Sequence, residues 1–299
     1  MTTMRPDEVD IDGPLAGRLI AEQFPQWASL AITKVRSAGT DNAIYRLGDD
    51  MAVRLPRIPS AAENVDTEQR WLPQLAPLLP LAIPVPLGRG VPGEGFPYPW
   101  SVYRWLDGGN AVEQPIVDLP DAAAQLGRFV AALQRFDATG GPPSFRAEPV
   151  STRDDDVRAA IRSLGADGTL DAALATAAWE TSLAAPAWDG TPVWIHADLH
   201  PANLLARNGR LAAVIDFGGL GVGDPACDML PAWTLLTGQT RDLFRAEANV
   251  DAAAWTRGRG WGLRFGLGAV HVYQVTNPVL AAIGQHAIAE ALTDHQNTT

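Results

Sequence analysis

The stretch WIHADLHPANLL (residues 194–205) sets two histidines, an aspartate and an asparagine in a short apolar frame. Burying a polar side chain without a partner costs about 1–3 kcal/mol, so a buried strand is rarely interrupted in this way without a reason. His196, Asp198, His200 and Asn203 are therefore the first candidates for chemistry.

The spacing within this stretch indicates phosphoryl transfer. Four residues separate Asp198 from Asn203, as in the protein-kinase catalytic loop, where the aspartate acts as base and the asparagine binds magnesium. Downstream, AAVIDFGG (residues 212–219) carries Asp216 at the end of an apolar run, followed by Phe and Gly as in the kinase magnesium-binding element. Magnesium is a hard cation that takes oxygen ligands, and a second carboxylate can accept a proton from a hydroxyl.

Taken together, HADLHPANLL…VIDFGGLGVGDPACD (residues 196–228) resembles the aminoglycoside phosphotransferase family, also called the choline/aminoglycoside kinase-like group. The resemblance implies a protein-kinase-like fold and phosphorylation of a small-molecule hydroxyl with ATP or GTP and Mg²⁺. It implies that Asp198 is the catalytic base, that Asn203 and Asp216 are the metal ligands, and that His196 supports the catalytic loop.

The resemblance extends to the front of the chain and implies a nucleotide site there. SAGTDNAIYRL (residues 37–47) stands where the family has its nucleotide-positioning loop, and AVRLPR (residues 52–57) would be the third strand. The backbone of SVYRWLDG (residues 101–108), at about Arg104 to Leu106, would bind the adenine. The implied phosphate contacts are Ser37, Gly39, Thr40 and Arg54, with Glu68 as the helix partner of Arg54 and Glu63 as its competitor.

The pattern along the chain predicts an α+β protein of two lobes. Residues 1–105 contain short β-type runs with helical patterns at 14–24 and 61–76, which indicates a sheet-rich N-terminal nucleotide-binding lobe. Residues 106–299 are mainly helical, at 119–136, 153–183 and 225–292, with β-like pieces at 193–196 and 211–215. We therefore expect a helical C-terminal catalytic and substrate lobe.

Composition narrows the class of partner. The net charge of −11 comes with no basic patch, which argues against a nucleic-acid partner. No apolar run reaches the roughly 18 residues of a membrane helix, and the polar start MTTMRPDEVD is unlike a signal peptide. With a single cysteine, Cys227, we expect a cytoplasmic protein without a membrane partner. The sequence predicts no oligomeric state.

Two other classes of function stay open at this point. In a strand, His196, Asp198 and His200 would share one face and could ligate zinc or iron, as in a metal-dependent hydrolase. Arg54, in place of the family's usual lysine, also fits a nucleotide-binding module without catalysis, although arginine can still bind phosphate.

Other residues have structural interpretations or suggest the acceptor. Asp224, before Pro225, is typical of a helix N-cap, and Asp228 is expected to tether that helix to the catalytic loop. Carboxylates and aromatic faces together suit a cationic ligand, so we expect a hydroxylated amine as the acceptor. The family resemblance makes an aminoglycoside the leading candidate, while a macrolide or another antibiotic, choline and a sugar stay open. The expected walls of the acceptor site are the helices at 153–183 and the tail helices, with Asp154, Asp155, Asp156, Trp255, Trp261, His271 and Tyr273.

Overall fold

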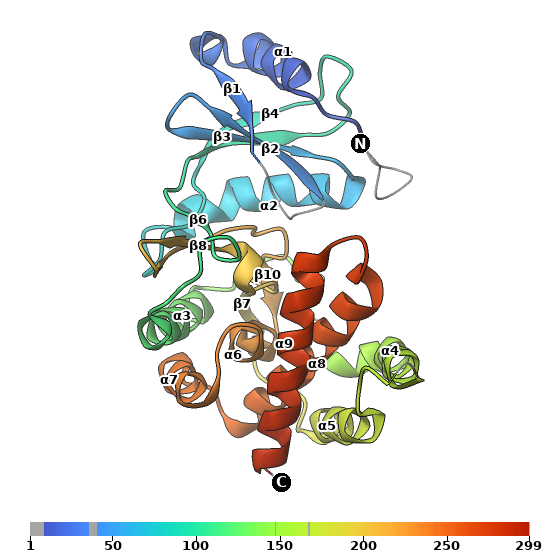
Figure 1. Ribbon diagram of the computed structural model, residues 1–299. Helices are drawn as coiled ribbons and strands as arrows, with labels where there is room; N and C mark the ends of the chain where they lie inside the picture. The colour runs from blue at the N-terminus through green and yellow to red at the C-terminus, as the bar shows by residue number, and fades with distance from the viewer. Residues whose placement is uncertain (1–8, 36–40, 147, 167, 299) are drawn as a thin grey trace. The chain divides into compact units, whose positions relative to one another are not determined.

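A computed structural model describes residues 9–35, 41–146, 148–166 and 168–298, which fall into two compact units (Figure 1). The first unit runs to Leu78, resumes at Ala82–Asp107 and includes Ile215–Gly218. The second unit comprises Leu79–Leu81, Gly108–Val214 and the chain from Gly219 onward. The sequence had placed the division between residues 105 and 106 and had assigned residues 215–218 to the helical part.

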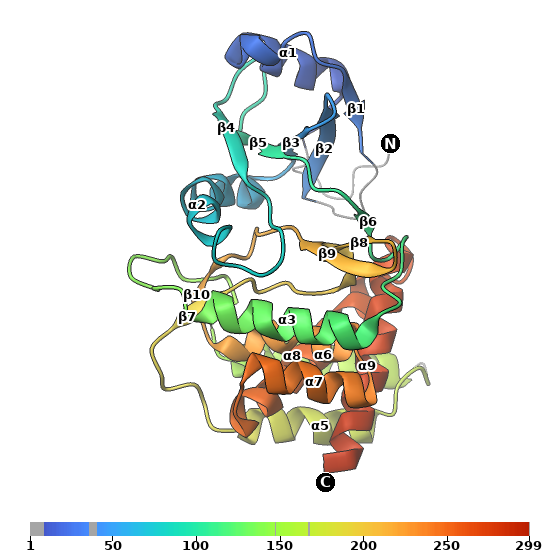
Figure 2. The same cartoon turned by 90° about the vertical axis from the view of Figure 1, so that its left-hand side faces the viewer.

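The first unit is a five-stranded antiparallel sheet with a helix on each face (Figures 1 and 2). The strands lie in the order β1-β2-β3-β5-β4. Their bounds are β1 Ile32–Lys34, β2 Asn42–Leu47, β3 Met51–Pro56, β4 Pro86–Gly90 and β5 Trp100–Arg104, and the helices are α1 Gly13–Gln23 and α2 Pro59–Leu75. A 3₁₀ turn, Pro25–Trp27, follows α1.

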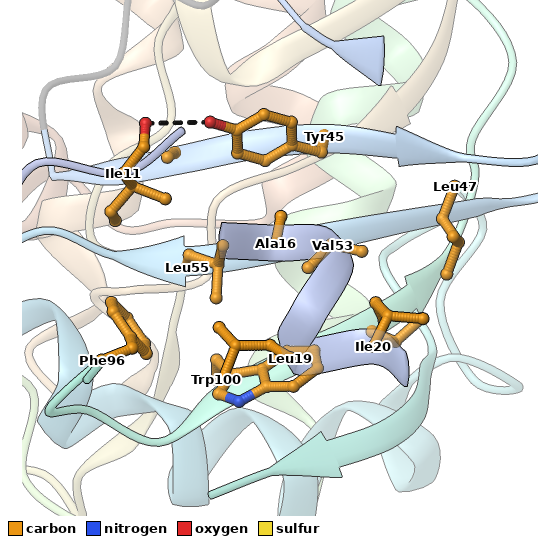
Figure 3. Packing of buried hydrophobic residues seen from close by; sticks show 12 residues of the cluster. Ile11, Ala16, Leu19, Ile20, Tyr45, Leu47, Val53, Leu55, Phe96 and Trp100 are labelled. Carbon is orange, nitrogen blue, oxygen red and sulfur yellow. Dashed lines mark hydrogen bonds between the residues drawn. The ribbon is translucent and has the colours of Figure 1, made fainter. Parts of the chain in front are cut away.

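The core of this unit lies between the sheet and α1. Figure 3 shows Leu19 and Ile20 of α1 beside Val53 and Leu55 of β3 and Trp100 of β5, and all five side chains are buried. Asp12 caps α1, since its carboxylate accepts a hydrogen bond from the main-chain N–H of Leu15. The sheet is therefore fixed against α1 on one face.

The opposite face of the sheet is covered by α2. The pleat of β3 directs the charged side chain of Arg54 toward that face. Successive side chains of a strand alternate between faces, so Arg54 points away from the face of its neighbours Val53 and Leu55. The register pairs Arg54 with Ser101 of β5. Arg54 is thus directed toward α2, which carries Glu68.

The second unit is mainly helical, with two small sheets. One sheet has the order β6-β8-β9 and the other pairs β10 with β7, both antiparallel. The strands are β6 Gly109–Asn110, β7 Val193–Ile195, β8 Leu204–Arg207, β9 Arg210–Val214 and β10 Gly221–Gly223. The helices are α3 Leu119–Gln134, α4 Asp154–Ala166, α5 Ala172–Ala184, α6 Pro231–Thr234, α7 Gly238–Ala248, α8 Ala252–Tyr273 and α9 Pro278–Thr298. Three 3₁₀ turns belong to this unit: Val150–Arg153, Pro201–Asn203 and Pro225–Met229.

The helices α8 and α9 pack side by side (Figure 1) and come unusually close at two glycines. A Cβ atom on Gly266 would lie 2.7 Å from the carbonyl oxygen of Gly284, and one on Gly284 would lie 2.9 Å from the carbonyl oxygen of Gly266. Glycine in a helix interior costs about 1 kcal/mol relative to alanine, so its presence here reflects this close approach.

The α+β class predicted from the sequence is confirmed, with a sheet-rich first unit and a helical second unit. The region 225–292, predicted to be mainly helical, contains four helices and a 3₁₀ turn. In the described part of the chain, no helix is both long and apolar enough to span a bilayer.

Gly266→Ala is expected to lower the free energy of unfolding by about 1–3 kcal/mol, because the new methyl group meets backbone that has no room to move. Gly268→Ala is the matched control in the same helix: a Cβ at Gly268 meets nothing within 4 Å, so helix propensity should raise stability by up to about 1 kcal/mol. Urea unfolding of both variants checks this. Equal effects of the two substitutions would contradict the close-contact account.

Candidate active site

In the first unit, three residues far apart in sequence form one ion cluster. The Arg54 guanidinium donates through Nη1 to Glu68 Oε1 at 2.5 Å and through Nη2 to Asp216 Oδ1 at 2.7 Å. Glu68 is the partner in α2, which confirms the predicted pairing over Glu63. β3, α2 and the segment after β9 thus supply one residue each.

Burial and neighbouring charges shift the pKa values of residues in this cluster. Burial disfavours the charged guanidinium, but Glu68 and Asp216 outweigh that effect and raise the pKa of Arg54 above its usual value. The Tyr103 hydroxyl donates to Glu68 Oε2, and burial together with that carboxylate raises the pKa of Tyr103. The side chain of Glu68 is 2% exposed, that of Arg54 17% and that of Asp216 42%, so Asp216 is the most exposed member of the cluster.

The backbone at Asp216 is strained. Its φ of 62° lies in the left-handed region, which is uncommon for a residue other than glycine. The apolar strand β9 ends at Val214, and the turn at Asp216 directs its carboxylate to Arg54. Sites that hold such strain are frequently functional, because the surrounding structure has to maintain the conformation.

In the second unit, the loop after β7 is built on a second strained residue. β7 ends at Ile195, and Ala197 follows with a φ of 70° and no exposed surface. The Asp228 carboxylate accepts hydrogen bonds from the main-chain N–H of His196 at 2.8 Å and of Ala197 at 2.7 Å. The expectation that Asp228 tethers the segment after Asp224 to this loop is confirmed.

Asp198 follows Ala197 in this loop, and its carboxylate lies between cationic and amide partners. Its Oδ1 is 2.8 Å from Nη1 of Arg146, and its Oδ2 accepts from Nδ2 of Asn203 at 3.0 Å. Nε2 of His200 is 3.3 Å from the same Oδ2. Burial raises the pKa of Asp198, but the charges of Arg146 and His200 outweigh it and hold that pKa well below its usual range. Asp198 is therefore an ionised carboxylate whose side chain is 27% exposed.

Asn203 is oriented in a way that suits a hard cation. Its Nδ2 donates to both the main-chain oxygen and the carboxylate of Asp198, so Oδ1 is the atom directed away from them. An amide oxygen at Asn203 and a half-exposed carboxylate at Asp216 are the donor types that magnesium accepts. The described residues contain no group of three or more His, Cys, Asp or Glu side chains that could hold a metal ion. Magnesium in such enzymes is commonly held by one or two protein ligands together with phosphates and water.

The premise of the hydrolase interpretation is wrong. Residues 196–200 are not a strand, because β7 ends at Ile195 and the chain turns at Ala197. The ring of His196 is fully buried and its Nδ1 accepts from the main-chain N–H of Asp198 at 3.2 Å, which positions the loop. The ring of His200 lies against Phe265, 5.0 Å between centroids.

The expected nucleotide contacts are only partly described. Ser37, Gly39 and Thr40 lie outside the described residues. The main-chain N–H of Arg104 donates to Val85 and that of Trp105 to Asp50, which closes the end of β5. No hydrogen bond to the main chain of Leu106 occurs within the described ranges, so its N–H and carbonyl are available for an adenine edge.

Asp224 behaves as the predicted N-cap, because its Oδ1 accepts from the main-chain N–H of Ala226 at 2.9 Å. It has a second role that the sequence did not indicate. The Arg257 guanidinium of α8 donates to both carboxylate oxygens, through Nε at 2.8 Å and Nη2 at 3.0 Å. This buried bidentate pair joins α8 to the turn that carries Asp228.

The expected acceptor walls are wrong at the two tryptophans. Trp255 and Trp261 are 5% and 3% exposed, and Trp255 packs on Trp233 in the core. The Asp154 carboxylate is occupied by Arg158 and by the indole N–H of Trp179. A helical run of aromatic residues has the same spacing in a core as in a binding site, so periodicity did not separate the two cases.

Arg146 is the residue of this site that the sequence did not reveal. It lies 52 positions before Asp198 in a loop without a motif, and only the fold brings the two together at 2.8 Å. Nη1 of Arg146 also donates to the carbonyl of Ala197, so one guanidinium holds both the strained residue and the carboxylate.

Solved structures share this fold. The GDP and kanamycin complex of APH(2″)-IIIa is 19% identical, with a TM-score of 0.70 over 93% of this chain and 98% of that chain. The GDP complex of wild-type aminoglycoside 2′-phosphotransferase-IIIa is 19% identical, with a TM-score of 0.73 over 95% and 100%. The apoenzyme of macrolide 2′-phosphotransferase MphH from Brachybacterium faecium is 23% identical, with a TM-score of 0.60 over 93% and 97%.

These likenesses confirm the predicted protein-kinase-like fold. No curated protein matches the chain. The family model described as "Phosphotransferase enzyme family" matches residues 32–261, which include both the Arg54 cluster and the Asp198 loop. The chain belongs to this phosphotransferase family.

Proposed function

We propose that this protein transfers the γ-phosphoryl group of ATP or GTP to a hydroxyl of a small molecule. The observation that carries the proposal is the Arg54 cluster, which unites β3, α2 and the Asp216 turn at 2.5 and 2.7 Å. Protein kinases need an equivalent cation–glutamate pair and an aspartate for magnesium. Family membership and relatives solved with GDP or ADP support the same conclusion.

In this proposal Asp198 accepts the proton of the attacking hydroxyl. A carboxylate ionised over the whole physiological pH range does not need to be deprotonated first, and its partial exposure leaves room for a substrate hydroxyl. Arg146, His196 and Asp228 hold the loop so that the carboxylate keeps one direction. Catalysis then depends on positioning the hydroxyl and not on a covalent step by the protein.

The first unit would bind the nucleotide. Arg54, held by Glu68, is suited to contact phosphate oxygens through its planar fork. Magnesium, when bound, neutralises charge on the phosphate oxygens, and Asp216 and Asn203 would hold it. Leu106 would contact the adenine or guanine edge with its main chain.

A non-catalytic nucleotide-binding module is the weaker alternative. Arg54 in place of lysine was its only support, yet this guanidinium forms the cluster expected of a working site. A module without transfer also has no need to hold an ionised carboxylate on a strained loop.

The chemical identity of the acceptor is the more specific part of the proposal. Neighbours are solved with kanamycin, gentamicin and streptomycin, which makes an aminoglycoside one candidate for the acceptor beside other hydroxyl compounds. The direct test is to incubate the protein with Mg-ATP or Mg-GTP and a panel containing these drugs, a macrolide, choline and hydroxycarboxylates. Gain of one phosphate by mass identifies the acceptor, and the absence of transfer to the whole panel with both nucleotides would count against the proposal.

Asp198→Asn is expected to reduce phosphoryl transfer by at least about a hundredfold, because the proton acceptor is lost with little change of shape. Nucleotide affinity should stay within about twofold of wild type, since Asp198 belongs to the acceptor side. Asp189→Asn, at an exposed position, controls for the loss of one negative charge. Wild-type turnover in Asp198→Asn, with the substitution verified by mass, would remove Asp198 from the role of base.

Arg54→Lys should keep measurable activity, because lysine preserves the charge but loses the fork that bridges Glu68 and Asp216. Arg54→Ala should weaken Mg-nucleotide binding by about tenfold or more and leave Glu68 buried without its cationic partner. Calorimetric titration with a non-hydrolysable ATP analogue measures both effects. If Arg54→Ala binds nucleotide as wild type does, Arg54 is not the phosphate clamp.

A further inference from the structure

Three arginines of the second unit gather around the Asp198 loop. Arg146 pairs with Asp198, Arg153 ends the 3₁₀ turn Val150–Arg153, and Arg264 lies in α8. α8 contacts that turn, and Phe265, next to Arg264, lies against His200 of the loop.

These arginines have more donors than the protein satisfies. Within the described residues Arg264 makes no hydrogen bond or ion pair, and its guanidinium carbon lies 5.7 Å from the ring centroid of Trp261. The Nε atoms of Arg146 and Arg153 are buried and also lack a partner there. A partly buried guanidinium without a partner costs free energy, so its retention indicates a partner that arrives with a ligand.

The charge around Arg264 is not balanced. Burial and the charges of Arg146 and Arg153 lower the pKa of Arg264 to about 10. Asp156 and Glu148 are exposed, and Cys227 stays a neutral thiol because burial raises its pKa. Arg146 is already paired with Asp198, and Arg153 forms an ion pair with the exposed Glu148, Nη2 to Oε2 at 3.3 Å. Arg264 is therefore the cation left to attract an anion, with Arg153 as a second contact.

We propose that Arg264, with Arg153, binds an oxyanion of the acceptor, so that the substrate is a hydroxyl compound carrying a carboxylate or phosphate group. This rests on the proposed function, because it places the acceptor beside Asp198. Arginine forks match both oxyanions in a bidentate manner. A polycationic acceptor would instead meet like charges, which costs affinity.

Nucleotide phosphates are the other source of such an oxyanion. We favour the acceptor because the three arginines lie in the second unit, on the elements that hold the proposed base. The phosphate-binding candidate Arg54 lies in the first unit. Phe145 is 58% exposed, and its ring centroid lies 5.0 Å from the guanidinium carbon of Arg146. This ring adds an apolar face for the carbon skeleton of an acceptor.

The test is calorimetric binding of malonate and of inorganic phosphate to the full chain, with and without a saturating Mg-bound non-hydrolysable ATP analogue. We expect at least one anion to bind in both conditions, and the tighter of the two identifies the group. Arg264→Gln should weaken binding by at least about tenfold, and Arg264→Lys by less. Arg162→Gln, at an exposed position of α4, controls for the loss of one positive charge.

Three results would overturn the inference: neither anion binds, binding is unchanged in Arg264→Gln, or the ATP analogue displaces the anion. Thermal unfolding separates a ligand-binding role from a structural one. Removing an unpaired, repelled charge should leave the melting temperature of Arg264→Gln equal or higher, whereas a structural role would lower it.

Failure of this inference and failure of the proposed function are distinguishable. Anion binding needs no turnover, so an intact anion site in a protein that transfers no phosphate would contradict the proposed function alone. Transfer confined to neutral or cationic acceptors, with no anion binding, would contradict the anionic acceptor alone.

Discussion

The buried carboxylate of Asp228 makes the interaction on which the conformation of the Asp198 loop depends. It accepts the main-chain N–H groups of His196 and Ala197, and so it maintains the left-handed conformation of Ala197. Burial raises the pKa of Asp228 to about 7 against the lowering effect of these two hydrogen bonds, which shows how costly the charge is at this position. The cost is consistent with selection for geometry at Asp198 in preference to stability.

Both units follow the same design, in which a small carboxylate-bearing turn is strained and a buried ion network holds it. In the first unit Arg54 and Glu68 fix the Asp216 turn, and in the second Arg146 and Asp228 fix the turn before Asp198. Both turns carry a residue other than glycine at positive φ, near 62° and 70°. Preorganised carboxylates of this kind suit a reaction in which placement and charge neutralisation lower the barrier.

The sequence predicted those parts of the candidate site that short sequence spacings or family motifs define. Asp198 with Asn203, Asp216 after an apolar strand, and the Arg54–Glu68 pair all follow from local patterns or from family motifs. Arg146 and Arg264 carry no such pattern, because they lie 52 and 66 positions away from Asp198 and only tertiary packing brings them to the loop. The prediction that Trp255 and Trp261 line the acceptor site was wrong for a different reason. The aromatic periodicity of a helix is the same whether the aromatic face contacts a ligand or the core.

The proposed role of Asp228 is to hold Asp198 in the geometry for transfer, and Asp228→Asn tests this role most directly. An amide oxygen can still accept one N–H, but the amide NH₂ would face the other donor, leaving a buried N–H unsatisfied. The measurement is single-turnover phosphoryl transfer to the identified acceptor beside the affinity for the Mg-bound ATP analogue. We predict transfer slowed by about tenfold or more with nucleotide affinity unchanged. Transfer at the wild-type rate in a folded Asp228→Asn protein would contradict the account.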